Sequence, residues 1–501
     1  MSVREIPMYI DGQPVMSQSQ EWRDVVNPAT QEVVARVPFC TSEEVERAVA
    51  SAKTAFKEWR KVPLGKRMRI MLKLQALIRE NTAELAALIT EEHGKTLPDA
   101  EGEVGRGLEV VEHACSITSL QLGELAENAA NEVDVYTMHQ PLGVGAGITA
   151  FNFPIMLPCF MFPLAIATGN TFVLKPSEQD PSSTMRLVEL AHEAGIPAGV
   201  LNVVHGGPDV ANQIADHQDI KALSFIGSTH VGSLLYNRAA AAGKRMQAMM
   251  GAKNHCVVMP DANRSQAIDS LLGSAFGAAG QRCMANSVVV LVGEAREWIK
   301  DIEAGARGMK VGPGSQRDAD LGPLVSPQAK ERVERLISAG EKEGATLLVD
   351  GRGYTVDGYP DGNFVGPTLF ADVTADMTIY REEIFGPVLT VYVYDEDKFE
   401  ETLDLVDSTS IYALTGAIFS KDRYAAELAT KRLEQSAGNF YINDKPTGAV
   451  VGQQPFGGAR GSGTNDKAGS MINLLRWVSP RTIKETFVSP TDYKYPFLGE
   501  D

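Results

Sequence analysis

From Val144 onwards, short apolar segments alternate with stretches of helical periodicity, and this alternation limits the possible folds more than any other feature of the chain. The apolar segments read GVGAGITAF, TFVLK, VLNVV and ALSFI. Strands that are apolar throughout are typical of parallel sheets covered by helices on both faces. We therefore predict an α/β fold with a Rossmann-type nucleotide-binding domain. A second run of the same kind begins near Cys256 and predicts a second α/β domain, where we expect the chemistry.

The first third of the chain reads as helical after a short β-like segment. Thr41 and Glu44 have the spacing of a capping box, which predicts a helix that continues to about Trp59. The helical pattern repeats over 64–93 and ends at a glycine, and a third amphipathic stretch covers 103–120. Two β-like segments, 133–137 and 477–485, lie outside the alternation, and such segments often pair with each other or form contacts between subunits.

Charge and cysteine content exclude several classes of protein. Lys and Arg number 47 and Asp and Glu 64, so the net charge is −17, which opposes binding to nucleic acid or to an anionic membrane. Five cysteines without a CxxC pair argue against a disulfide framework and against a zinc site, and we expect no metal. The first residues lack an apolar core, so we expect no signal peptide and a cytoplasmic protein. The uncharged stretch 135–174 is interrupted by four prolines, which disfavours a membrane span.

Cys283 is the candidate nucleophile. It follows the small residues of 277–280, which let a ligand approach the backbone, and Arg282 beside it would favour the thiolate. The alternative is a buried structural thiol, the common state of a cysteine in apolar surroundings.

Three further groups follow apolar segments. Asn152 can point its amide at an anionic oxygen, or it can cap a turn. Lys175 and Glu178 follow a strand whose end could place them on the ribose hydroxyls of a nucleotide, although a solvated turn fits as well. Gly227 and Ser228 form a turn before a helix, where backbone N–H groups can meet a pyrophosphate, but they lack the Gly-x-Gly-x-x-Gly fingerprint.

Together with EEIFGP at 382–387 and PFGG at 455–458, these groups resemble the aldehyde dehydrogenase superfamily in order and spacing along nearly the whole chain. The resemblance implies that Cys283 is the nucleophile and that Asn152 donates to the oxyanion. The residues that match the family's NAD-binding positions are Phe151, Lys175, Glu178, Gly227, Ser228, Glu383 and Phe385. Glu178 beside the ribose would repel a 2′-phosphate, which favours NAD over NADP.

The same resemblance implies a division of the chain. We expect an NAD-binding domain from residues 1–122 and 142–251 and a catalytic domain from 252–462. Residues 123–141 and 463–501 would form a small β oligomerisation element with a C-terminal tail, which assembles a homo-oligomer, a dimer of dimers.

The chain departs from the hydrolytic members of the family at Met249. Those members carry Glu-Leu-Gly-Gly-Lys, whose Glu activates water, whereas 249–253 read MMGAK. A thioether accepts no proton, and water is a poor nucleophile without a base, whereas a thiol with a pKa of about 8.5 is partly ionised at neutral pH. We therefore expect coenzyme A to clear the thioester. One alternative stays open: Met249 is ordinary core packing and another residue, such as Glu382, serves as the base.

The stretches 249–255, 280–285 and 105–107 resemble the coenzyme A-acylating branch of the family. In that branch two arginines hold a substrate carboxylate, and the matching positions are Arg106 and Arg282; for Arg106 the alternative is a salt bridge on a helix surface. The resemblance implies oxidative decarboxylation of methylmalonate or malonate semialdehyde to propionyl- or acetyl-coenzyme A with reduction of NAD. A hydrolytic aldehyde dehydrogenase that gives a free acid, and a silent NAD-binding scaffold, are the competing hypotheses.

Overall fold

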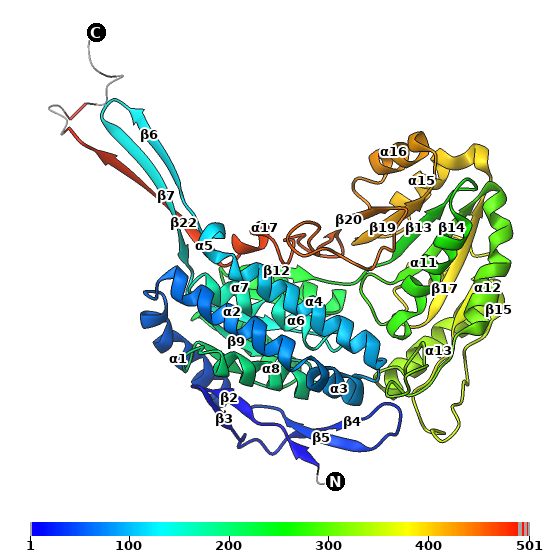
Figure 1. Cartoon of the computed structure of the whole chain (residues 1–501), viewed down its shortest axis with the longest axis horizontal. Coiled ribbons are helices and arrows are strands. Elements are labelled where there is room, and N and C mark those ends of the chain that lie inside the picture. The colour runs from blue at the N-terminus through cyan, green and yellow to red at the C-terminus, as the bar shows by residue number, and fades with distance from the viewer. Residues whose placement is uncertain (1–2, 489–492, 495–497, 499–501) are drawn as a thin grey trace.

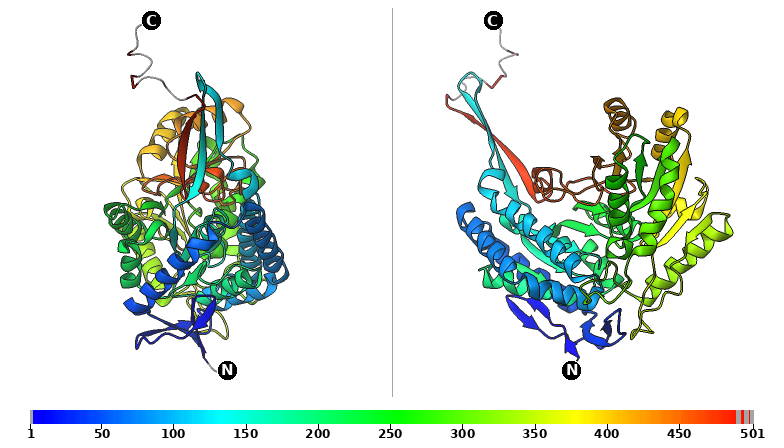
Figure 2. Two further views of the ribbon diagram at one scale, coloured as in Figure 1. Left: turned by 90° about the vertical axis from the view of Figure 1, so that its left-hand side faces the viewer. Right: turned by 45° about the vertical axis from the view of Figure 1, so that its right-hand side comes forward.

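The computed structural model describes residues 3–488, 493–494 and 498. These residues form two seven-stranded sheets with helices packed against them, and a three-stranded ribbon that projects from the first sheet (Figure 1). The right-hand view of Figure 2 shows the ribbon standing away from both sheets.

The first sheet is the α/β unit predicted from Val144 onwards. Its strand order is β12-β11-β8-β9-β10-β2-β3, parallel from β12 to β10 and antiparallel at β2 and β3. Its strands are β2 (Met8–Ile10), β3 (Gln13–Val15), β8 (Val144–Ile148), β9 (Thr171–Lys175), β10 (Leu201–Val203), β11 (Ile220–Ile226) and β12 (Arg245–Met249). Every residue of β8, β9 and β10 is buried, as expected for strands covered on both faces. The sequence did not indicate β12, because Arg245 and Gln247 interrupt its apolar run.

Ten helices in the described chain pack around this sheet or lead into it. They are α1 (Ser42–Trp59), α2 (Leu64–Glu80), α3 (Thr82–His93), α4 (Leu97–Cys115), α5 (Ile117–Leu120), α6 (Met156–Cys159), α7 (Phe162–Ala167), α8 (Pro181–Glu193), α9 (Pro208–Asp216) and α10 (Thr229–Ala241). The capping box is confirmed, since Thr41 accepts from the Glu44 N–H and the Glu44 carboxylate accepts from the Thr41 N–H.

Two helix predictions need correction. The stretch 64–93 is two helices rather than one, because Asn81 leaves helical geometry and its side-chain amide donates to the Leu77 carbonyl at 2.8 Å. The third helix begins at Leu97 rather than near residue 103, because Thr96 caps it by accepting from the Asp99 N–H. This longer helix, α4, reaches the site described below.

The second sheet forms from the part of the chain after Lys253 and confirms the second predicted α/β unit. Its order is β15-β16-β17-β14-β13-β19-β20, with only the β15–β16 pair antiparallel among its described strands. Its strands are β13 (Asn254–Val258), β14 (Asn286–Val292), β15 (Thr346–Val349), β16 (Thr368–Ala371), β17 (Val388–Tyr394), β19 (Thr415–Phe419) and β20 (Asn439–Ile442). The helices that follow β12 in the chain are α11 (Arg264–Phe276), α12 (Ile299–Gly308), α13 (Pro327–Lys342), α14 (Thr378–Arg381), α15 (Phe399–Ser408), α16 (Arg423–Arg432) and α17 (Met471–Leu474).

The two β-like segments outside the alternation pair with each other. In the ribbon, β7 (Val133–Pro141) lies between β6 (Glu124–Ala130) and β22 (Val478–Thr486), and both pairs are antiparallel. Smaller sheets are formed by β1 (Arg4–Glu5), β5 (Val33–Pro38) and β4 (Trp22–Val26), and by β18 (Tyr412–Ala413) with β21 (Ala459–Arg460). None of the helices within the described ranges has the length and apolar composition needed to cross a membrane.

The C-terminal part of the chain returns to the first sheet before it enters the ribbon. Thr464 donates its N–H to the Ala248 carbonyl at 2.9 Å, and Met250 donates to the Ser462 carbonyl at 2.8 Å. These bonds therefore hold the carboxyl end of β12 between the two sheets, next to the site.

Replacing Thr41 with Ala tests the capping box. The variant leaves the Glu44 N–H without its side-chain acceptor, so we expect the free energy of unfolding to fall by about 1 kcal/mol. Urea unfolding followed by circular dichroism measures this. Ser315→Ala, at an exposed turn, is the control and should shift the urea midpoint by much less; equal shifts in the two variants would contradict the role given to the cap.

Candidate active site

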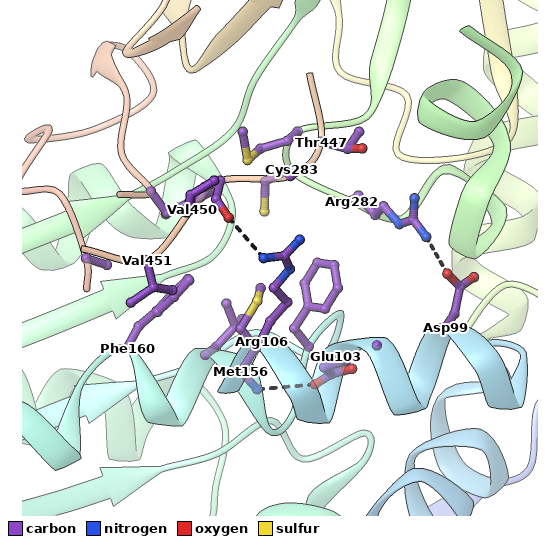
Figure 3. Close-up of a pocket in the computed structure, with 18 of the residues that line it drawn as sticks. Asp99, Glu103, Arg106, Met156, Phe160, Arg282, Cys283, Thr447, Val450 and Val451 are labelled. Carbon is purple, nitrogen blue, oxygen red and sulfur yellow. Dashed lines mark hydrogen bonds and ion pairs between the residues drawn. The ribbon is translucent and has the colours of Figure 1, made fainter. Parts of the chain in front are cut away.

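Cys283 lies where two cavities meet. The first cavity has a volume of about 540 Å³ and is lined by Cys283 together with Arg106 and Arg282 (Figure 3). The second has a volume of about 310 Å³. It is lined by Cys283 and by six other predicted site residues, Phe151, Asn152, Gly227, Ser228, Glu383 and Phe385. The thiol thus lines two cavities whose other lining residues differ.

A strained turn presents the thiol. Ala278, Ala279 and Gly280 all have left-handed backbone conformations, with φ of 51°, 52° and 71°. A Cβ on Gly280 would lie 2.0 Å from the Gly386 carbonyl oxygen, so only glycine fits there. The Ala278 N–H donates to the Asp99 carboxylate at 3.1 Å. The left-handed conformation costs conformational free energy at each of the two alanines. Such strain is typically kept where the site needs a particular backbone geometry.

The Asn152 amide faces the sulfur. Asn152 is buried, and its Nδ2 lies 3.2 Å from the Gln281 carbonyl oxygen and 3.5 Å from Cys283 Sγ. An amide nitrogen carries two hydrogens, so one can bond to Gln281 while the other points to the sulfur or to an oxygen formed beside it.

The pKa of Cys283 is raised to about 11, chiefly by burial and then by the Glu383 carboxylate, while the Asn152 hydrogen bond works in the opposite direction. The expectation that Arg282 favours the thiolate is wrong in this structure. The Arg282 guanidinium points away to α4 and pairs with Asp99 at 2.5 Å (Figure 3). Asp99 balances the charge of Arg282, so Arg282 does not stabilise the Cys283 thiolate.

The carboxylate that shares both a cavity and an electrostatic contact with Cys283 is Glu383. Burial raises the pKa of Glu383 to about 7, while the Ala252 N–H at 3.0 Å, Arg332 and Lys253 act to lower it. Glu382, considered above as a substitute base, has an exposed side chain and lines neither cavity.

Met249 is a core residue. It is buried at the end of β12, its carbonyl accepts from the Gly227 N–H at 3.1 Å, and it lines neither cavity. Its neighbour Met250 lines the second cavity instead. Met249 is therefore packed in the core, as the alternative above supposes, and β12 offers no carboxylate at this position.

The predicted cofactor residues gather at the carboxyl edge of the first sheet. Ile148 is the register partner of both Phe225 and Lys175, so the segments after β8, β9 and β11 emerge side by side. In α/β sheets this edge is where ligands bind. The Phe151 ring meets the Phe385 ring edge to face with centroids 5.9 Å apart, and Ser228 caps α10.

Lys175 and Glu178 lie at the same edge but outside the second cavity. The Lys175 ammonium is buried and donates to the Gly206 carbonyl at 2.6 Å and to the Glu178 carboxylate at 3.3 Å. Burial acts to raise the pKa of Glu178, but Lys175, the local backbone and Arg23 lower it below the ordinary value. Glu178 therefore carries a negative charge at neutral pH.

Arg106 lines the first cavity. Its guanidinium also pairs with Glu109 at 2.9 Å on the same helix, as in the salt-bridge alternative, with the side chain about half exposed.

Three residues that reach the site were missed by sequence reasoning: Lys95, Asp99 and Glu103. Nothing in the sequence marks them, because their contacts to Asn152, Arg282 and Ile155 join segments that are far apart in the chain. No group of three or more His, Cys, Asp or Glu able to hold a metal ion occurs among the residues described here.

Comparison with known proteins supplies the family. The model of the aldehyde dehydrogenase family matches residues 15–483. The chain belongs to the aldehyde dehydrogenase family. This confirms the resemblance inferred from the sequence.

Relatives and solved structures extend this result. The chain is 51% identical over 426 residues to the acylating, mitochondrial methylmalonate-semialdehyde/malonate-semialdehyde dehydrogenase of Rattus norvegicus, covering 84% of this chain and 79% of that one. A crystal structure of methylmalonate-semialdehyde dehydrogenase from Oceanimonas doudoroffii has a TM-score of 0.94 and 40% identity, covering 97% of this chain and 99% of that chain. Betaine aldehyde dehydrogenase from Staphylococcus aureus in complex with NAD⁺ has a TM-score of 0.92 and 29% identity, covering 99% and 97%. The predicted aldehyde dehydrogenase-like α/β fold is confirmed.

Two substitutions should change the reactivity of Cys283 in opposite directions. Asn152→Ala removes the hydrogen bond that lowers the Cys283 pKa, and Glu383→Gln removes the charge that raises it. At about pH 8, alkylation of the NAD-free protein by iodoacetamide should therefore be slower in the first variant and faster in the second, each by about threefold to tenfold, because the thiolate is the reactive form.

The pH profile provides the control for this pair. Glu383 loses its charge as the pH falls below about 7, so Glu383→Gln and the wild type should alkylate at the same rate near pH 5.5. The wild-type rate should keep rising above about pH 9, since the thiol pKa is about 11. A shift in the same direction for both variants would contradict the assignment.

Proposed function

We propose that this protein catalyses the NAD-dependent, coenzyme A-acylating oxidation of methylmalonate semialdehyde and malonate semialdehyde, giving propionyl- and acetyl-coenzyme A with loss of the carboxyl group. The observation that carries the proposal is the position of Cys283 between two cavities, with the Asn152 amide beside it and a buried Met249 where hydrolytic members have a Glu. The names of close relatives agree with this substrate class.

The residues around the second cavity fit NAD. The N-terminus of α10, capped by Ser228, offers backbone N–H groups to a pyrophosphate, and Glu178 offers a charged oxygen to ribose hydroxyls. Gly227 keeps this turn open, because a Cβ there would lie 2.5 Å from the Phe225 ring. Bound in this way, NAD supplies a hydride acceptor beside Cys283. The charge on Glu178 repels a 2′-phosphate and so favours NAD over NADP.

The acylation step uses Cys283 and Asn152. The sulfur attacks the aldehyde carbon, and the resulting oxyanion accepts hydrogen bonds from Asn152 Nδ2 and from the Cys283 N–H. Return of the oxyanion electrons to the carbonyl expels hydride and leaves a thioester on Cys283. The buried thiol must lose its proton first, and the raised pKa makes this loss unfavourable until a ligand changes the surroundings.

Loss of the carboxyl group follows from the same geometry. A carboxylate one carbon away from the thioester can leave as carbon dioxide, with its bonding electrons passing to the thioester oxygen to give an enolate. That oxygen occupies the position served by Asn152, and the enolate carbon then takes a proton. Neither biotin nor a metal is needed for this step.

Coenzyme A is the proposed acceptor because Met249 stands where hydrolytic members carry the Glu that activates water. Met249 is apolar and packed in the core, and a thiol ionises far more readily than water. Thiolate attack on the Cys283 thioester forms the new thioester and releases Cys283.

Arg106 and Arg282 are the proposed ligands of the substrate carboxylate. Both line the first cavity, and paired guanidinium contacts can orient a substrate that offers little apolar area. Each arginine also has a carboxylate partner within the protein, Glu109 and Asp99, so the substrate would share or replace these partners.

We further propose the assembly and location of the enzyme. The expected division assigns 1–122 and 142–251 to cofactor binding, 252–462 to catalysis, and 123–141 with 463–501 to assembly of a homotetramer; parts of the two terminal ranges lie outside the described residues. The exposed Leu125 and Met138 on the ribbon support its use as a contact surface. A cytoplasmic location is supported by five cysteines that are all free, whereas the rat relative is named mitochondrial.

Omission of coenzyme A tests the proposed function. With NAD and malonate semialdehyde alone, we expect about one equivalent of NADH per Cys283, followed by a rate lower by about a hundredfold or more, because Met249 replaces the Glu that activates water in hydrolytic members. Addition of coenzyme A should restore steady turnover, with acetyl-coenzyme A as the product detected by mass spectrometry.

The control is Cys283→Ala, which should form no NADH in either condition. Full steady turnover of the wild type without coenzyme A would favour the hydrolytic alternative. An inactive wild type that still binds NAD would favour the scaffold.

Arg106→Met tests the carboxylate site. We expect the KM for malonate semialdehyde to rise by about tenfold, because a charge-assisted hydrogen bond is lost, while the KM for propanal changes by less than about twofold. Arg79→Met is a matched control, since Arg79 is exposed and pairs with Glu112 of α4 but does not line the cavity. Equal changes for both aldehydes would contradict the role of Arg106.

A further inference from the structure

A buried ion pair lies beneath the segment that carries Asn152. The Lys95 ammonium and the Glu103 carboxylate are 2.7 Å apart, and their side chains are 1% and 0% exposed. Lys95 stands just before α4 and Glu103 within its first turns. Two charges buried so completely cost desolvation energy, and an apolar pair could fill the same space. Lys95 and Glu103 also bind other groups, and these contacts explain why the two charges are buried here.

Lys95 holds the backbone of Asn152. Its ammonium donates to the Asn152 carbonyl oxygen at 2.7 Å and lies 4.2 Å from the centre of the Phe153 ring. A buried ammonium has three hydrogens to place, and Glu103, Asn152 and the aromatic face accept them.

Glu103 holds the other end of the same segment. One carboxylate oxygen takes the bond from Lys95, and the second accepts the N–H of Ile155 at 2.8 Å and of Met156 at 3.3 Å. The bond from Glu103 to Met156 is visible in Figure 3. The segment from Asn152 to Met156 is therefore fixed at both ends by one ion pair from α4.

This clamp determines where the Asn152 side chain points. The Asn152 carbonyl and the N–H groups three and four residues later are all bonded to the pair, so the backbone that carries the amide has little freedom. The amide itself touches only the Gln281 carbonyl and the Cys283 sulfur among the described contacts, and both lie on the other side of the site. A shift of the segment would move Nδ2 out of reach of the sulfur.

From these contacts we propose that Lys95 and Glu103 are positioning residues for the reaction, which hold the Asn152 amide against Cys283 and the oxyanion. Neither residue lines the second cavity or has a bond to the sulfur, and although Glu103 also lines the first cavity, both of its oxygens are bonded within the protein, so we infer that the pair acts through Asn152. This inference rests on the proposed function for its catalytic consequence, but its structural half concerns Cys283 and Asn152 alone.

A double-mutant cycle with Asn152→Ala tests the proposal. Lys95→Met, Glu103→Gln and the double variant Lys95→Met/Glu103→Gln are made in the wild type and in Asn152→Ala. Glu103→Gln keeps the shape of the side chain, and the double variant leaves no lone buried charge, so the test does not depend on one variant that fails to fold. NAD binding, followed by fluorescence, and thermal unfolding report on the folded state of each.

The first readout needs no substrate. In the wild-type background the Glu103→Gln and double variants should slow iodoacetamide alkylation of Cys283 by about fivefold and move its pH profile upward, because the sulfur loses its amide donor. In the Asn152→Ala background the same changes should alter the rate by less than about 1.5-fold, because the contact is already absent.

The second readout is the first-turnover formation of NADH with malonate semialdehyde. It should slow by about tenfold in the wild-type background with little change in KM, and by less than about twofold in Asn152→Ala, because residues that act as a unit are not additive. The control Lys300→Met/Glu297→Gln removes an exposed ion pair and should change neither readout.

Equal slowing in the two backgrounds, or no slowing in the wild type, would overturn the proposal, since a general loss of stability acts regardless of Asn152. If the protein is instead a silent NAD-binding scaffold, no protein in the series forms NADH, including the wild type, while the alkylation cycle still decides the positioning role.

Discussion

The site depends on the burial of a sulfur that has to become an anion. Removing the Cys283 thiol from water raises its pKa, and the nearest carboxylate, Glu383, raises it further. Arg282 does not offset this effect because Asp99 neutralises it. The Asn152 amide is the side-chain contact that favours the anion, and the Cys283 N–H acts in the same direction. We propose that the same amide serves the oxyanion later in the reaction, so one side-chain donor would stabilise two successive anions.

Helix α4 joins the two halves of the site. Asp99 in its first turn holds the Ala278 N–H of the turn that presents Cys283, and Glu103 holds the segment of Asn152. These two elements follow strands and helices of different sheets, and the contacts of α4 add to the direct bond between Asn152 and the Gln281 carbonyl. Arg106 extends from the same helix into the first cavity. A single rigid element therefore sets the distances among nucleophile, oxyanion donor and proposed substrate ligand.

Much of this arrangement could be predicted from the sequence. Apolar strands and turn motifs gave both sheets, and Cys283 and Asn152 stand in motifs whose order along the chain is specific. The contacts of α4 could not be predicted, because Lys95 and Glu103 bind backbone groups of the segment Asn152 to Met156, which is far away in sequence and carries no residue type that signals such a contact. The partner of Arg282 was missed for the same reason, so its effect on the thiol was misjudged. The single helix predicted over 64–93 includes Asn81, because hydrophobic periodicity carries no information on a side chain that hydrogen-bonds to a backbone carbonyl of the helix.

The ribbon has a consequence for the synthesis of the chain. Strand β7 is synthesised well before β22, which pairs with it from Val133 to Pro141. Until β22 has been made, β7 has an open strand edge, which is a template for pairing with another nascent molecule.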